Sequence, residues 1–169
     1  ELVVYREKEI EERGTSKLGF QINPYNFDSQ DELQIFRYLR QALDKDEHVN
    51  DVYFTGGVPY AEHNEFFFEY ANPEKEGTIS RYFPDFLVET SKGRFLVVEI
   101  KGDDEKHAYN TEKARLQSGQ VTSVENTILA KELGFTEFQQ LNKNFEYHII
   151  FNGTMETHKQ ELVQLIQKL

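Results

Sequence analysis

Two short segments of the chain place ionisable residues where the pattern is otherwise that of an apolar strand. They read FPDFLV at residues 83–88 and VVEIKG at residues 97–102. Because side chains alternate across a strand, Glu99 and Lys101 lie on one face and Ile100 on the other. A hairpin register that brings Asp85 beside Glu99 would gather two carboxylates and one ammonium at one rim of a sheet. Charges in such apolar surroundings are costly unless they are paired or bind a metal ion.

The chemistry that suits this set of groups is metal-dependent attack on a phosphodiester. Two carboxylates can hold a Mg²⁺ ion that keeps several of its waters. A nearby ammonium can orient or deprotonate one of those waters, or offset charge that builds on the phosphate. We therefore predict that Asp85 and Glu99 bind the metal and that Lys101 is a catalytic residue.

The competing interpretation of the same residues is an ordinary surface hairpin. Glu99 and Lys101 would then form an exposed ion pair that contributes little to stability. The valines before Glu99 and the isoleucine after it are too apolar for a comfortable edge strand. The sequence therefore favours a site over a surface pair.

Two consecutive strands must position these residues. Residues 79–89 and 93–101 are predicted as strands joined by a turn at residues 91–93, and the second has the apolar run of a central strand covered on both faces. Apolar periodicity, capping residues and glycine or proline breaks predict the other elements. These are a helix over 29–43, strands over 51–60 and 65–70 with a turn at 72–77, a helical region from 110 or 111, a helix over 123–133 ended by Gly134, a strand over 146–151 and a helix from 157. The order favours one α/β domain.

Composition narrows the class of protein. The chain has 169 residues and no cysteine, which excludes a disulfide scaffold, a zinc ribbon and a cysteine nucleophile. No apolar run approaches the ~20 residues that span a bilayer, and no signal peptide opens the chain, so we expect a cytoplasmic protein without a membrane partner. Because the chain does not begin with Met, we expect a piece of a longer protein. Residues 1–28 would be an N-terminal extension or the remnant of a preceding domain, and residues 29–169 the functional domain.

The charge balance bears on how substrate would be bound. The chain has 30 acidic and 19 basic residues, a formal net charge of −11. A domain that binds nucleic acid through its own phosphate contacts usually carries a basic surface. An acidic chain fits better with an enzyme that uses a divalent cation and that another domain carries to its substrate.

The two segments resemble the PD-(D/E)XK nuclease superfamily, which has the restriction-endonuclease-like fold. Pro84 and Asp85 match the "PD" half of its motif, and the run from Glu99 to Lys101 matches the "(D/E)XK" half. The resemblance covers the chain from about Ser29 to Phe151. Within the superfamily, the segments are similar to the C-terminal nuclease domain of type III restriction enzymes and of related helicase-nucleases.

This resemblance implies a fold, an activity and partners. The fold would be an α/β restriction-endonuclease-like core, a central mixed β-sheet flanked by helices in αβββαβ order. The activity would be Mg²⁺-dependent hydrolysis of DNA phosphodiester bonds by an endonuclease, with Mn²⁺ able to replace Mg²⁺. The partners would be DNA and an ATP-dependent helicase or translocase domain in the same or an associated chain. The implied catalytic residues include Asp85, Glu99 and Lys101, and the Ile100 carbonyl would be a further metal ligand.

A fourth acidic residue of the superfamily lies on the first helix, where Glu32 is the best match. Glu32 also has a purely structural interpretation. With Ser29 as the N-cap residue, it completes a capping box at the start of the predicted helix. Glu32 precedes Ile35 and Phe36 by three and four positions, which places it on the apolar face of that helix. Both roles stay open.

Two other functions fit the same sequence. A nuclease-like module that has lost catalysis would serve as a docking platform for a protein or a nucleic acid, with its acidic surface facing the partner. Alternatively, the chemistry is kept and the substrate is RNA or branched DNA, because such sites act on the phosphate and recognition lies elsewhere. Divalent-metal binding that requires Asp85 and Glu99 separates the enzyme from the platform.

Overall fold

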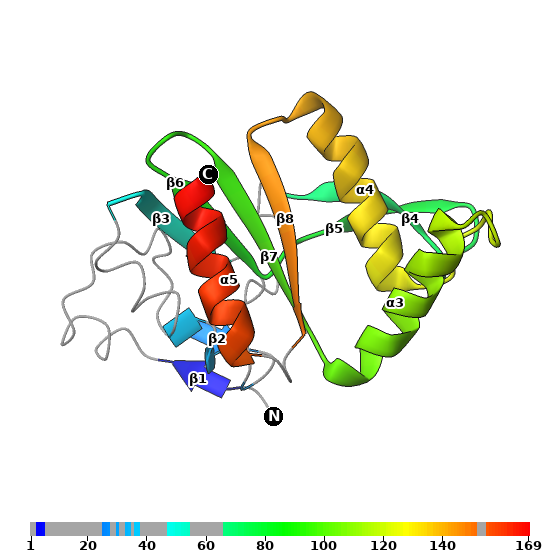
Figure 1. Cartoon of the computed structure of the whole chain (residues 1–169), viewed down its shortest axis with the longest axis horizontal. Helices are drawn as coiled ribbons and strands as arrows, with labels where there is room; N and C mark the ends of the chain where they lie inside the picture. Colours follow the sequence, from blue (N-terminus) through cyan, green and yellow to red (C-terminus); the bar gives the residue numbers. More distant parts are fainter. Residues whose placement is uncertain are drawn as a thin grey trace.

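The structure is a computed structural model of the chain, and Figure 1 shows its arrangement. It describes residues 3–5, 25–27, 30, 33–34, 36–37, 47–54, 66–151 and 155–169. The strands are β1 (Val3–Tyr5), β2 (Tyr25–Phe27), β3 (Val49–Phe54), β4 (Phe68–Asn72), β5 (Thr78–Tyr82), β6 (Phe86–Thr90), β7 (Phe95–Lys101) and β8 (Phe145–Phe151). The long helices are α3 (Asp103–Gln117), α4 (Thr127–Leu141) and α5 (Met155–Lys168).

A mixed sheet of four strands forms the centre of the fold, in the order β3-β6-β7-β8. β6 is antiparallel to both β3 and β7, whereas β8 runs parallel to β7. The parallel pair requires a crossover, and α3 and α4 supply it. Residues 96–99 of β7 are all buried, so the prediction of a central strand covered on both faces is confirmed. The protein therefore belongs to the α/β class.

Helices cover the two faces of this sheet, on either side of β8 in Figure 1. Alternate residues of β7 point to opposite faces, and Leu96 and Val98 pack in a cluster with Leu162 and Ile166 of α5. Leu33 and Phe36, two described residues of the helix predicted over 29–43, belong to the same cluster. Val97 faces the other way, into a cluster that includes residues of α4 and of the β4–β5 hairpin.

The predicted strand over residues 79–89 is wrong, because this segment forms two strands. β5 pairs with β4 in a separate two-stranded sheet, and β6 begins the hairpin with β7. Residues 83–85 between them belong to neither ladder, and Pro84 has no N–H to donate to one. The break frees Asp85 from strand pairing just before β6. The predicted turn at 91–93 is confirmed, and Gly93 adopts the positive φ of 70° that a tight turn needs.

The helical region predicted from residue 110 or 111 begins earlier, at Asp103. Three acidic residues occupy the first turn of α3, where they complement the positive end of the helix dipole. Glu105 accepts a hydrogen bond from the N–H of Gly102 (3.2 Å), which stabilises the start of the helix. The polar stretch that directly follows β7 is therefore helical.

The helix predicted over 123–133 and ended by Gly134 is also wrong in its bounds. α4 runs from Thr127 to Leu141, with the side chain of Asn126 as its N-cap, and it passes through Gly134. A Cβ atom at Gly134 would lie 2.4 Å from the backbone oxygen of Glu69 and 2.7 Å from the Cβ of Tyr70. The glycine lets α4 approach β4 closely.

The remaining elements differ from prediction at their ends. The strand predicted over 51–60 starts at 49 and is described to 54, and the one over 65–70 is β4 at 68–72. β8 starts at 145 and α5 at 155, each one or two residues before the predicted position. No helix in the described part of the chain is long and apolar enough to cross a membrane.

Candidate functional site

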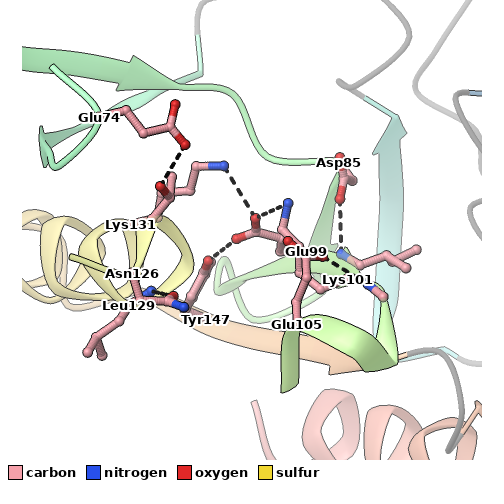
Figure 2. Close-up of polar contacts among 12 residues, drawn as sticks. Glu74, Asp85, Glu99, Lys101, Glu105, Asn126, Leu129, Lys131 and Tyr147 are labelled. Atoms are coloured by element: carbon pink, nitrogen blue, oxygen red, sulfur yellow. Dashed lines mark hydrogen bonds and ion pairs between the residues drawn. The ribbon is translucent and has the colours of Figure 1, made fainter. Parts of the chain in front are cut away.

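The hairpin of β6 and β7 places Asp85 next to Glu99. Its register pairs Phe86 with Val98, so one further step along the two strands sets Asp85 opposite Glu99. The backbone N–H of Ile100 donates a hydrogen bond to Oδ2 of Asp85 (3.0 Å), which joins the segment before β6 to the end of β7 (Figure 2). Lys101 follows on the same face as Glu99. The structure thus brings together the predicted Asp85, Glu99, Ile100 and Lys101.

Glu99 is the centre of this cluster. It lies on the face of β7 that α4 covers, and its relative exposure is 0%. The hydroxyl of Tyr147, on the neighbouring strand β8, donates a hydrogen bond to its Oε2. Its Oε1 lies 3.0 Å from Nζ of Lys101 and 3.7 Å from Nζ of Lys131, a residue of α4. Figure 2 shows the three partners converging on this one carboxylate.

Lys131 reaches the cluster from α4, above the sheet. Its side chain is 14% exposed, against 21% for Lys101. Its ammonium also lies 4.2 Å from the centre of the Tyr82 ring, a cation–π contact that partly replaces lost hydration. Lys101 is thus the more accessible of two ammonium groups that share one buried acid.

The pKa values of the two lysines in the cluster are shifted in opposite directions. Burial by itself would lower the pKa of Lys101, but Glu99 foremost, with Asp85 and Glu105, raises that pKa above its ordinary value. Burial lowers the pKa of Lys131; Glu99 opposes this shift, and the Lys101 ammonium reinforces it. The buried Glu99 is therefore held between two positive charges that repel each other.

Two tyrosines complete the surroundings of Glu99. Burial, and then the charge of Glu99, raise the pKa values of Tyr82 and Tyr147 well above the usual 10.0. Both phenols therefore keep their protons at neutral pH. Tyr147 can act there only as a donor to the carboxylate, because Glu99 would repel a phenolate.

The oxygen atoms present fit a Mg²⁺ ion. Asp85 and Glu99 supply carboxylates, and the Ile100 carbonyl would be a third oxygen; Mg²⁺ commonly takes one or two carboxylates and keeps waters for the rest. Oε1 of Glu99 is fully enclosed, and its partners are the ammonium groups of Lys101 and Lys131, which form ion pairs with it. An oxygen that attracts two ammonium groups can also attract a metal cation. Among the described residues there is no group of three or more His, Cys, Asp or Glu side chains that could hold a metal, so the predicted site rests on two carboxylates.

The fourth predicted acid, Glu32, lies outside the described residues. Two residues of the site were missed by sequence analysis, Lys131 and Tyr147. Lys131 interrupts an apolar stretch just after the buried Ala130, and Tyr147 occupies an alternate position of an aromatic strand. Both are unremarkable locally, and only the pairing of β8 with β7 and the packing of α4 bring them to Glu99.

Comparisons with known proteins add no family to this description. No protein-family model, no curated protein and no solved structure matches the chain. What can be said of the chain's activity therefore depends on the chemistry of the cluster around Glu99 and on the motif residues that it contains.

Proposed function

We propose that the chain is a metal-dependent nuclease domain that hydrolyses DNA phosphodiester bonds at Asp85, Glu99 and Lys101. The observation that carries this proposal is the meeting of the Asp85 and Glu99 carboxylates and the Lys101 ammonium at the open end of the β6–β7 hairpin, away from its turn. Each charge removed from water must be compensated, and a metal ion bound by the two carboxylates is one way to compensate them.

The order of elements supports the same proposal. Helical residues at 30, 33–34 and 36–37 precede β3, β6 and β7, which are antiparallel in turn, and α3 and α4 then lead to β8, parallel to β7. If α3 and α4 are counted as one helical crossover and the β4–β5 hairpin as an insertion between the first and second strands, this order agrees with the αβββαβ order expected of a restriction-endonuclease-like core. We propose that fold for residues 29–169.

The residues of the site divide the work of hydrolysis. Asp85 and Glu99 would hold Mg²⁺, which when bound polarises the phosphate and activates water. The Ile100 N–H fixes the Asp85 carboxylate, and Tyr147 fixes that of Glu99, so neither has to reorganise. Lys101, the more exposed of the two lysines, would stabilise charge that develops on the phosphate.

Substrate binding would come from elsewhere in the parent protein. The net charge of −11 provides little attraction for DNA. We propose that this chain is the cleavage module of a larger restriction or helicase-nuclease protein, in which an ATP-dependent translocase domain holds the DNA.

One observation favours a second function, the catalytically inactive docking module. Both oxygens of Glu99 already have partners within the protein, in Tyr147, Lys101 and Lys131. A cluster that is neutralised in this way can be purely structural, and the acidic surface would then face a partner.

Mg²⁺ titration by calorimetry separates the two functions, with Asp85→Asn as the matched variant. The nuclease proposal predicts Mg²⁺ binding that Asp85→Asn abolishes, together with nicking of supercoiled plasmid that EDTA stops. The same assay with single-stranded DNA and RNA identifies the substrate. Absence of both Mg²⁺ binding and nicking would leave the docking module.

A further inference from the structure

Lys131 occupies a position of α4 where an apolar residue would be expected. One turn later on the same side of the helix lies Phe135, which is buried against the sheet. The residue just before Lys131, Ala130, is buried in the same cluster. A lysine here brings a charge into a largely apolar interface, and its side chain keeps only 14% exposure. Such a placement is costly unless the charge is paired, and Glu99 is the partner that Lys131 has here.

The two carboxylates that would hold a metal ion already face two lysines. Asp85 and Glu99 both act on Lys101 and Lys131, and Glu105 adds a further acidic group near Lys101. Lys101 alone is close enough, at 3.0 Å, to serve as the ion-pair partner of Glu99. Lys131 supplies a second positive charge. Without it, a bound cation would have to supply that charge opposite Asp85 and Glu99.

The position of Lys131 brings it into competition with a metal. Its ammonium approaches the same enclosed Oε1 atom of Glu99 that forms the ion pair with Lys101. A divalent cation held by Asp85 and Glu99 would share the Glu99 carboxylate with this ammonium. Like charges on one partly buried carboxylate repel each other, so the ammonium would weaken the binding of the cation.

We propose that Lys131 is the built-in counter-ion of Glu99. Its ammonium takes the place of the divalent cation when none is bound, and its charge thereby sets the affinity of the site for Mg²⁺. This inference rests on the proposed function, because it takes Asp85 and Glu99 to be the metal ligands. Lys131 is a positioning residue: it acts on the metal through Glu99 and through its charge.

The test measures Mg²⁺ binding to the 169-residue chain by calorimetry, without nucleic acid. Lys131→Met removes the charge and keeps an unbranched apolar chain beside Tyr82, so the packing of α4 is retained. Lys131→Gln is the second charge-free variant if the methionine variant does not melt cooperatively. Lys113→Met is the matched control, since Lys113 also forms an ion pair, with Glu132 at 2.6 Å, in a separate cluster between α3 and α4.

Removal of the Lys131 charge is expected to tighten Mg²⁺ binding by about tenfold or more, whereas Lys113→Met leaves it unchanged. Binding of Mg²⁺ by the Lys131 variant alone, with none to the wild type, would also support the inference while contradicting the nuclease proposal. Equal affinities of wild type and Lys131→Met would overturn the inference and leave the nuclease proposal standing. Equal tightening by Lys113→Met would overturn it as well, since only net charge would then matter. Absence of binding to every form would overturn both.

Discussion

Replacing Glu99 by Gln in the metal-free protein removes one negative charge from a fully buried position and barely changes the side-chain volume. The amide can still accept a hydrogen bond from Tyr147. It cannot neutralise Lys101 and Lys131, whose ammonium groups approach Oε1 at 3.0 and 3.7 Å. We therefore expect the variant to fold but to be clearly less stable than the wild type.

The size of the effect follows from the burial of the two lysines. Removing one member of a buried ion pair typically costs ~3–5 kcal/mol. The side chains of Lys101 and Lys131 keep 21% and 14% exposure, so we expect the lower end, about 3 kcal/mol. Lys131→Met alone should cost about 1 kcal/mol, because Lys101 still neutralises Glu99. The double variant should lose about 2 kcal/mol rather than the sum of about 4, a coupling energy of about 2 kcal/mol.

The assay is urea denaturation of the four proteins in EDTA at neutral pH, with the free energy of unfolding obtained by linear extrapolation. Lys113→Met combined with Glu99→Gln provides the control, and its effects should simply add. A Glu99→Gln variant as stable as the wild type, or additive effects in the cycle with Lys131, would refute the ion-pair network described here.

Three further predictions concern pH, packing and salt. Folding raises the pKa values of Tyr82 and Tyr147 above the usual 10.0 and that of Lys101 above the usual 10.5. The free energy of unfolding should therefore be constant near neutral pH and fall above about pH 10. The pKa of Lys131 is lowered instead, which offsets only part of this loss. Tyr147→Phe should reduce this alkaline loss in urea melts at pH 8 to 11, and an unchanged slope would contradict the assignment. Gly134→Ala should destabilise by about 1–2 kcal/mol, since overpacking against the Glu69 carbonyl outweighs the ~1 kcal/mol gained in helix propensity; a more stable variant would show that α4 can move away from β4. Plasmid cleavage by the isolated chain should be weak and fall steeply as salt rises from 50 to 200 mM NaCl, and salt-resistant cutting would contradict the need for a DNA-binding partner.

The sequence was informative where structure is local. The apolar run of β7 and the glycine turn at residue 93 fix the hairpin with β6, and the hairpin register in turn sets Asp85 beside Glu99. Alternation along β7 then places Lys101 on the same face as Glu99. These contacts join residues fewer than 20 positions apart, so short-range patterns suffice to predict them.

Contacts between distant segments could not be predicted in this way. Tyr147 meets Glu99 only because β8 pairs in parallel with β7 across two helices, and Lys131 does so only because α4 packs on that face. Pro84 separated β5 from β6, although the apolar pattern ran through it. Local signals predict that Gly134 ends a helix, whereas its role, the close approach of α4 to Glu69, is tertiary. In each case packing overrode a valid local signal.

Single-turnover cleavage of plasmid DNA at saturating Mg²⁺ tests the nuclease mechanism most directly, for the wild type and for Asp85→Asn, Lys101→Ala and Lys101→Arg. Asp85→Asn is expected to abolish cleavage. Lys101→Ala is expected to slow cleavage by about 100-fold or more while Mg²⁺ affinity is kept or increased, because the lost charge acts on the transition state. Lys101→Arg should rescue poorly, since the planar guanidinium differs in shape from the ammonium. Equal rates for all four proteins would contradict the nuclease mechanism, whatever the fold.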